Sequence, residues 1–130
     1  MSETVGLKLV QAIAAQDAAA IEDCFGQEAE FRALTPYGLR ERKGADETAA
    51  LIAAWFGDST VIDLVDTRTG EVGDRLHLMY RFEGIEEGKP YVVQHHLYYT
   101  LHEGKIAAAD LLCSGFIPRG NTSQSGVVSV

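Results

Sequence analysis

The stretch RLHLMYRFEGIEEGKPYVVQHHLYYTL, residues 75–101, decides the fold. Apolar and polar residues alternate from Arg75 to Glu83, and a second run rich in aromatic and β-branched residues extends from Tyr91 to Leu101. A period of two is typical of a half-buried strand. The intervening segment from Gly84 to Pro90 contains glycine and several charges, so the two runs are predicted to form an antiparallel hairpin.

The position of the turn sets which residues share a side of this hairpin. A turn centred near Glu87 pairs Tyr80 with Gln94 and Leu78 with His96. One face, expected to be the inner one, then contains Leu76, Leu78, Tyr80, Phe82, Val92, Gln94, His96, Tyr98 and Thr100. The other face contains His77, Met79, Arg81, His95, Leu97, Tyr99 and Leu101. This second face is apolar for a surface that meets water, so the chain is predicted to form a homodimer through the outer sheet face.

Three helices and further strands are predicted around the hairpin. Apolar residues at helical spacing indicate helices at Thr4 to Ala15, after Asp17, and from about Glu47 to Phe56, and further strands are expected at Ala29 to Leu34, Thr60 to Asp66 and Ile106 to Phe116. Helices followed by consecutive strands indicate an α+β fold, in which three N-terminal helices pack on a strongly curved mixed or antiparallel sheet and enclose a pocket. A single domain is expected over residues 1–117, followed by a polar tail over 118–130.

Composition excludes several classes of function. The 130 residues match one domain, and a net charge of −8 argues against nucleic acid or an anionic membrane as partner. No membrane span or signal segment is evident, so a cytoplasmic location is expected. Cys24 and Cys113 are predicted to be buried reduced thiols. Because phosphate-loop and metal-site motifs are absent from the sequence, no cofactor or metal is expected.

The candidate catalytic residues are His96 and Asp110. His96 could exchange protons near neutral pH, with Tyr80 or Gln94 to orient its ring, although a satisfied core histidine is the alternative. Asp110 is the only charged residue between Ile106 and Phe116. A carboxylate in such a strand is paired, at an edge, or tuned to act as an acid or base.

Large apolar side chains are the candidate ligand-binding residues. Trp55 lies at the end of the third predicted helix, where it could pack in the core or line a pocket for a flat apolar molecule. The residues expected to contact a small cyclic ligand are Phe31, Trp55, Tyr80, Gln94, Tyr98 and Leu111.

Several local motifs resemble a known superfamily. They are the run Ala14-Ala15-Gln16-Asp17 with Ala20 to Phe25, the strand Glu30 to Ala33, the Lys43-Gly44 lead into a helix ending Trp55-Phe56, and the turn Gly104-Lys105-Ile106. Over residues 3 to about 117, the chain resembles the nuclear transport factor 2 (NTF2)-like superfamily, and within it the SnoaL-like proteins and ketosteroid isomerases. The resemblance implies a cystatin-like cone with a hydrophobic pocket.

The resemblance also bears on activity. Leu9 and Ala33 stand where ketosteroid isomerases have an oxyanion tyrosine and a catalytic aspartate, so steroid isomerisation is disfavoured. His96 stands at the position of the protonated acid, and SnoaL-type cyclases use a last-strand carboxylate for which Asp110 is the available equivalent. Three hypotheses remain open: a cofactor-independent acid/base catalyst of the cyclase, isomerase or dehydratase class, a non-catalytic ligand-binding or dimeric assembly module, or a purely structural dimer whose cavity is filled by side chains.

Overall fold

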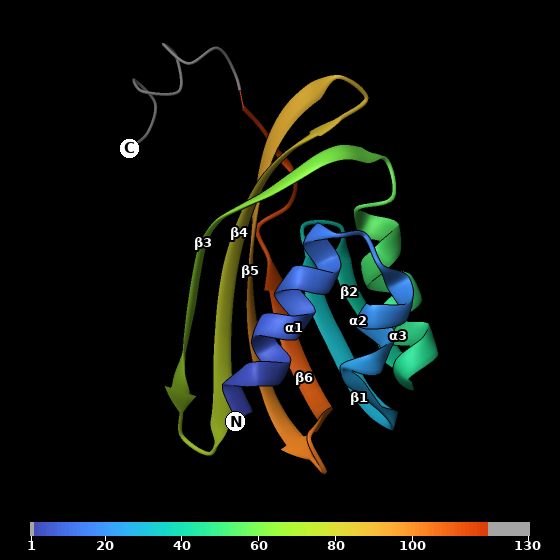
Figure 1. Ribbon diagram of the computed structural model, residues 1–130, viewed down its shortest axis with the longest axis vertical. Coiled ribbons are helices and arrows are strands. Elements are labelled where there is room, and N and C mark those ends of the chain that lie inside the picture. The colour runs from blue at the N-terminus through green and yellow to red at the C-terminus, as the bar shows by residue number, and fades with distance from the viewer. Residues whose placement is uncertain (1, 120–130) are drawn as a thin grey trace.

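Three helices precede most of a curved sheet in residues 2–119, the part of the chain that the computed structural model describes (Figure 1). The elements are α1 (Ser2–Ala14), α2 (Ala18–Asp23), β1 (Phe25–Thr35), β2 (Gly38–Lys43), α3 (Ala45–Trp55), β3 (Ser59–Val72), β4 (Arg75–Glu86), β5 (Lys89–His102), β6 (Lys105–Cys113) and β7 (Ile117–Pro118). The predicted helices and hairpin are all present, with bounds that differ by a few residues.

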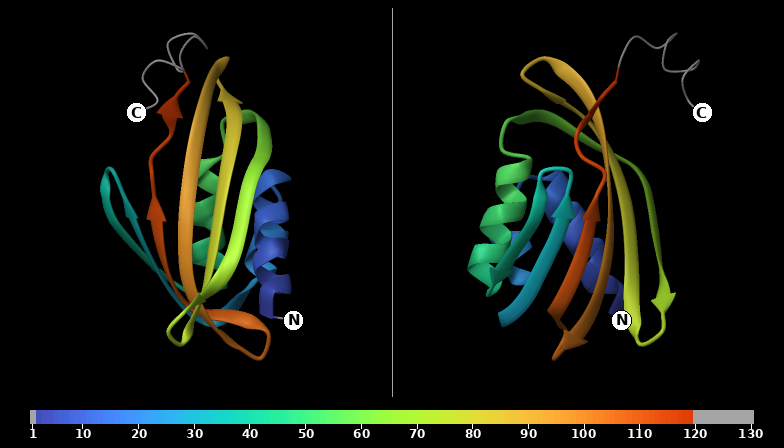
Figure 2. Two further views of the ribbon diagram at one scale, coloured as in Figure 1. Left: turned by 90° about the vertical axis from the view of Figure 1, so that its left-hand side faces the viewer. Right: turned by 180° about the vertical axis from the view of Figure 1, so that it is seen from behind.

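The strands form one mixed sheet in the order β2-β1-β6-β5-β4-β3, and the short β7 pairs with β5. Strands β1 and β6 run parallel, and the other neighbouring strands of residues 2–119 pair antiparallel. Figure 2 shows the sheet curving around the helices, which all lie on its concave side. The predicted α+β class, with helices packed on a strongly curved sheet, is therefore confirmed.

Helices α2 and α3 have different kinds of N-cap residue. Asp17 caps α2, because its carboxylate accepts a hydrogen bond from the Ala20 N–H at 3.1 Å. Helix α3 starts earlier than predicted: Gly44 is the N-cap, with a positive φ of 94°, and Asp46 lies in the first turn. Within residues 2–119, no helix is long and apolar enough to cross a membrane.

The core fills the space between the helices and the concave side of the sheet. Its largest fully buried side chains are Tyr80, Tyr99, Phe31, Phe56 and Phe82, joined by aliphatic residues of α1 and α3. Phe56, the C-cap of α3, meets Phe82 of β4 edge to face, with ring centroids 5.7 Å apart. Such edge-to-face packing fills the space between the end of α3 and β4 with side chains.

Two strand assignments differ from the prediction. Strand β2 was not predicted, because its charged sequence lacks an apolar face; it is an edge strand that pairs only with β1 among the described strands, where charges oppose unwanted strand pairing. The predicted last strand is divided, since β6 ends at Cys113 and the chain leaves the sheet before β7. Residues 120–130 of the predicted tail lie outside the described residues.

The packing of β4 against its neighbours predicts a specific cost for enlarging Gly84. A Cβ atom there would lie against the Val61 carbonyl oxygen and within 2.5 Å of the Tyr91 hydroxyl. We expect Gly84→Ala to lower the free energy of unfolding by about 2 kcal/mol, measured by urea denaturation. Gly70→Ala is the control, because nothing lies within 4 Å of that position; equal losses in the two variants would contradict the close approach.

Candidate functional site

A two-residue turn closes the β4–β5 hairpin. Glu87 and Gly88 both have positive φ, 53° and 78°, as a type I′ turn requires. Glu86 therefore pairs with Lys89. The predicted turn was centred on Glu87, whereas the actual centre lies between Glu87 and Gly88, so the predicted register is wrong by one residue.

This shift exchanges the two sides of β5. Tyr80 lies opposite His95, and His96 lies opposite Met79 on the outer side. The side chains of β5 that face the core are Tyr91, Val93, His95, Leu97 and Tyr99, whereas Val92, Gln94, His96, Tyr98 and Thr100 are half-buried on the outer side. Leu97 and Tyr99 were expected on the homodimer face, so the homodimer stays a prediction without that basis.

Three polar side chains form a hydrogen-bonded chain on the inner side of the sheet. The Tyr80 hydroxyl lies 2.8 Å from His95 Nδ1, and His95 Nε2 lies 3.2 Å from Cys113 Sγ. Tyr80 and His95 are buried, and Cys113 is partly exposed. Trp55 and Phe56 flank the His95 ring at centroid distances of 5.5 and 6.1 Å. This hydrogen-bonded chain of side chains thus runs from an apolar interior to a partly exposed cysteine residue.

Hydrogen-bond satisfaction fixes the protons of this chain. Among the described residues, His95 Nδ1 is the hydrogen-bond partner of the Tyr80 hydroxyl, so that hydroxyl donates to Nδ1. Nε2 then carries the imidazole proton and donates to Cys113 Sγ. The Gly115 backbone N–H donates to the same sulfur at 3.3 Å. The sulfur therefore accepts two hydrogen bonds.

Burial keeps all three groups uncharged near neutral pH. Desolvation, with a smaller contribution from nearby His96, lowers the pKa of His95 to about 3. Desolvation raises the pKa of the Tyr80 hydroxyl above its ordinary value. It also raises the pKa of the Cys113 thiol, although the hydrogen bond from Gly115 acts in the opposite direction.

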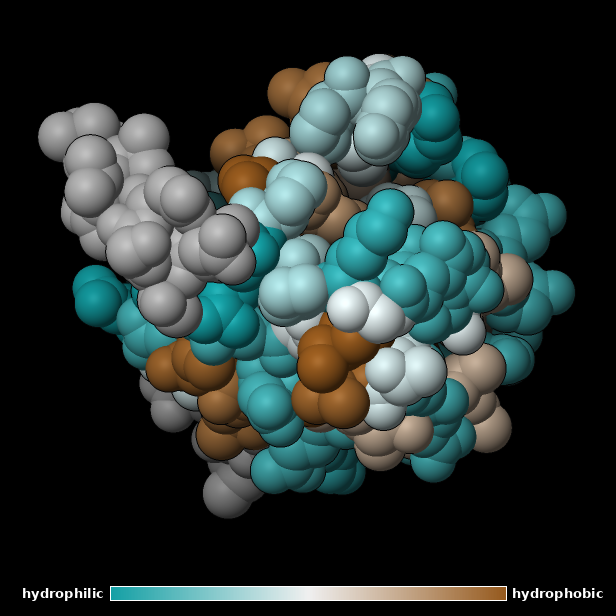
Figure 3. Space-filling view, turned by 90° about the horizontal axis from the view of Figure 1, so that it is seen from above, coloured by the Kyte–Doolittle hydropathy of each residue, from teal (hydrophilic) through white to brown (hydrophobic). Residues whose placement is uncertain are grey.

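A cavity of about 360 Å³, here called the mouth cavity, lies at the Cys113 end of the Tyr80–His95–Cys113 hydrogen-bonded chain. It is lined by Thr35, Pro36, Tyr37, Arg40, Trp55, Glu86, Cys113, Gly115 and Phe116. Among the described residues, no salt bridge occupies Arg40 or Glu86. Figure 3 views the molecule from above, where hydrophobic and hydrophilic residues are interspersed. The mouth cavity therefore combines aromatic walls with two charges available to a ligand.

His96 belongs to a different hydrogen-bonded chain on the outer side. Arg81 Nε donates to Gln94 Oε1 at 2.9 Å, so the Gln94 amide N–H₂ faces His96 Nε2 at 2.8 Å and donates to it. His96 Nδ1 then carries a proton and donates to His77 Nε2 at 3.0 Å. Tyr98 stacks on the His77 ring at 4.8 Å. Both ring nitrogens of His96 are therefore occupied.

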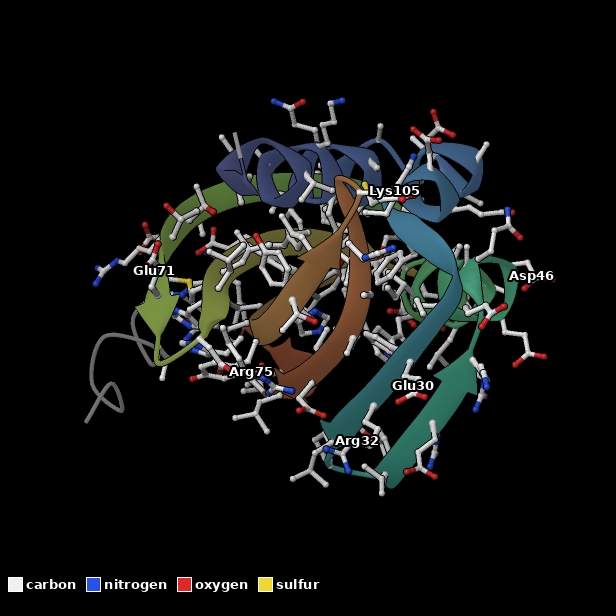
Figure 4. The ribbon with its side chains drawn as sticks, turned by 90° about the horizontal axis from the view of Figure 1, so that it is seen from below. Glu30, Arg32, Asp46, Glu71, Arg75 and Lys105 are labelled. Carbon is white, nitrogen blue, oxygen red and sulfur yellow. The ribbon has the colours of Figure 1, made fainter. Side chains whose placement is uncertain are left out.

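Asp110 is a paired carboxylate on the same outer side. One oxygen accepts from Arg32 Nε at 2.9 Å and the other from Arg75 Nη1 at 2.7 Å. Burial alone would raise the pKa of Asp110, but the hydrogen bonds and charges of the two arginines hold it below its ordinary value. Figure 4 shows Arg32 and Arg75 on the side of the sheet away from α1.

The predicted site residues are divided between the two sides of the sheet. Tyr80 belongs to the inner hydrogen-bonded chain and Trp55 packs on its His95 ring, whereas Phe31 packs against Trp55 and Leu111 is buried in the core. The residues on the outer side are Gln94, His96, Tyr98 and Asp110. His96 and Asp110 thus share a face, but that face is not the cone interior, and their catalytic roles stay predictions.

Sequence reasoning missed four residues of the hydrogen-bonded chain and the mouth cavity: Arg40, Glu86, His95 and Cys113. A turn placed between Glu87 and Gly88 would have identified His95, since it moves that residue to the side of Tyr80. Arg40 lies on the unpredicted strand β2, and Glu86 lies beyond the predicted end of β4. No local pattern in the sequence indicated that these two charges meet at one cavity.

Residues 7–109 match the family model described as a SnoaL-like domain. The chain belongs to the SnoaL-like family. Solved structures with the NTF2-like and ketosteroid isomerase-like fold agree with this assignment, as the sequence motifs predicted. No curated protein sequence matches the chain.

Three solved structures illustrate the likeness in fold. An NTF2-like protein from Anabaena variabilis ATCC 29413 is 17% identical with a TM-score of 0.71, covering 88% of this chain and 87% of that one. A protein of ketosteroid isomerase-like fold from Catenulispora acidiphila DSM 44928, in complex with trimethylamine, is 13% identical with a TM-score of 0.70 and 85% coverage of both chains. An LEH-like epoxide hydrolase from M. tuberculosis is 13% identical with a TM-score of 0.68, covering 87% and 82%.

The buried neutral His95 predicts a pH dependence of stability. Below the ordinary histidine pKa of about 6.5, the unfolded chain takes up a proton that folded His95 does not accept until about pH 3, so the free energy of unfolding falls as pH falls. Between about pH 7 and about pH 5, this linkage removes about 2 kcal/mol. Urea denaturation of wild type and His95→Gln across that window measures it as a slope that is steeper in the former, while the lowered pKa of His77 contributes a slope of the same sign to both.

His96→Gln is the matched control, because His96 neighbours His95 on the same strand but lies on the outer side. It should retain the slope. A slope lost in His96→Gln and kept in His95→Gln would contradict the observed register. If His95→Gln does not fold, imidazole NMR of the wild type replaces it, with His95 expected to stay neutral at about pH 5.

Proposed function

We propose that the protein binds a small ring-containing molecule with a carbonyl or carboxylate oxygen in the mouth cavity. The observation behind this proposal is that Trp55, Phe116 and Tyr37 surround one cavity of about 360 Å³ together with Arg40, which has no salt-bridge partner in the described part of the chain. Aromatic walls with a few polar groups are typical of ligand sites, which range from about 300 to about 1,000 Å³. The size favours a ligand of one or two rings.

The charges of the mouth cavity suggest how the ligand is oriented. The guanidinium of Arg40 presents donors only, so it would bind an oxygen acceptor. Glu86 would accept a hydrogen bond from a ligand hydroxyl and disfavour a second anion nearby. Relatives in fold include a protein solved with trimethylamine and an epoxide hydrolase, which supports a cone that takes small molecules.

Acid/base catalysis is the second candidate, favoured by the Tyr80–His95–Cys113 chain that ends at the mouth cavity. In this version the carboxylate beside the substrate is Glu86. Catalysis by His96 and Asp110, as the sequence suggested, would require a substrate on the outer side, where His96 lines a separate hollow of about 450 Å³. We favour binding in the mouth cavity, because both nitrogens of His96 and both oxygens of Asp110 already have partners.

Phenylpropionate tests the proposed role of Arg40. Trp55 is the only tryptophan of the chain and lines the cavity, so its fluorescence reports binding there. We expect Arg40→Gln to weaken phenylpropionate binding about tenfold or more, since a hydrogen bond to a charged group contributes about 1.5–3 kcal/mol. Glu86→Gln should tighten binding, because it removes a like charge.

Arg68→Gln serves as the control, since Arg68 is an exposed arginine of β3 outside the cavity lining. Its affinity for phenylpropionate should match wild type. Unchanged affinity in Arg40→Gln would contradict the role of this residue. A preference for phenylpropylamine over phenylpropionate would reverse the proposed charge selectivity and assign Glu86 as the anchor.

A further inference from the structure

We propose that Cys113 is a nucleophile that forms a thioether with an α,β-unsaturated carbonyl ligand seated in the mouth cavity. This inference rests on the proposed function for the presence of a ligand there, and it adds the chemical class of that ligand. It depends on three observations: the place of the sulfur in the fold, its hydrogen bonds, and the polar lining opposite it.

Cys113 lies at the end of β6, where the chain leaves the sheet. Strand β6 ends at this residue, and the chain leaves the sheet at Ser114 and Gly115 before β7 begins at Ile117. Cys113 lines the mouth cavity and also the hollow on the outer side of the sheet. A ligand in the mouth cavity can therefore contact the sulfur directly.

The hydrogen bonds at the sulfur favour its reactive form. His95 Nε2–H and the Gly115 N–H, at 3.2 and 3.3 Å, both donate to Sγ, and two donors stabilise a thiolate more than a thiol. The Tyr80 hydroxyl keeps the imidazole in this donating tautomer. Burial opposes ionisation, so the thiolate forms as a minor species that the chain of donors makes available.

The reaction needs no oxidant or cofactor. The Cys113 thiol loses its proton to water, and the sulfur electron pair forms an S–C bond at the β-carbon of the ligand. The C=C π electrons shift toward the carbonyl oxygen, where the Arg40 guanidinium would stabilise the enolate. A proton from water then bonds to the α-carbon, so the net change is addition of S–H across the double bond.

Cys24 provides an internal control for this chemistry. It is 3% exposed, and burial raises the pKa of its thiol to about 11. Its sulfur donates to the Ala20 carbonyl oxygen at 3.5 Å. A thiol that only donates and is shielded from solvent should react slowly, so selectivity between the two cysteines measures the effect of the site.

Benzylideneacetone and its saturated analogue benzylacetone separate covalent capture from binding. Intact-mass measurement of the wild type with benzylideneacetone should show one added ligand, and peptide mapping should place it on Cys113, with a rate about tenfold or more above that at Cys24. Cys113→Ser should form no such adduct while still binding benzylacetone, as followed by Trp55 fluorescence.

The outcomes distinguish the two proposals. Binding of benzylacetone without an adduct on Cys113 would overturn the covalent proposal and leave the proposed function standing. An adduct on Cys113 without benzylacetone binding would support the reactive thiol and contradict the ligand site. Equal labelling of Cys24 and Cys113 would overturn the covalent proposal.

Tyr80→Phe tests the positioning role of the hydroxyl. Without it, His95 is free to place its proton on Nδ1 and loses its obligatory donation to sulfur. The pH at which the labelling rate is half-maximal should then rise relative to wild type. An unchanged pH profile in a folded Tyr80→Phe variant would remove Tyr80 and the His95 tautomer from the mechanism.

Discussion

The pairing of Glu86 with Lys89 across a two-residue turn is the constraint on which the site depends. Side chains alternate along a strand, so one turn fixes which residues of β5 enter the cone. With this register, β5 contributes one polar residue, His95, to an otherwise apolar inner side, directly opposite Tyr80. A slip of one residue would turn Gln94 and His96 toward the core and Leu97 and Tyr99 toward the outer side, so more polar groups would be buried.

The sequence predicted features that depend on neighbouring residues better than features that depend on how strands pair. Alternation within β4 correctly placed Leu78, Tyr80 and Phe82 on the inner side, because that pattern is local and one side is fully apolar. Strand β5 has apolar or aromatic residues on both sides, so its own pattern could not select a face. The face assigned to β5 residues therefore depended on the predicted position of the turn. An error of half a residue in the turn centre exchanged the predicted sides of His95 and His96.

The mouth cavity was beyond prediction for a related reason. It gathers residues from the β1–β2 turn, β2, the end of α3, the end of β4 and the segment after β6, which are distant in sequence. Each is unremarkable alone: Arg40 belongs to an alternating run of charges, and Glu86 is one of several acids near a turn. Only the closure of the sheet around the helices brings a cation, an anion and aromatic rings to one place.

Hydrogen-bonding capacity distinguishes the two polar clusters of the sheet. On the outer side, the direction of each hydrogen bond follows from Arg81, which can only donate, and it leaves His96 with both nitrogens occupied. Asp110 likewise has a guanidinium on each oxygen. On the inner side, the hydrogen-bonded chain that begins at Tyr80 ends at the partly exposed Cys113, beside Arg40 and Glu86, which have no salt-bridge partner within residues 2–119. Free capacity of this kind is what a ligand needs, so we expect chemistry at the mouth cavity, and the catalytic roles of His96 and Asp110 stay predictions.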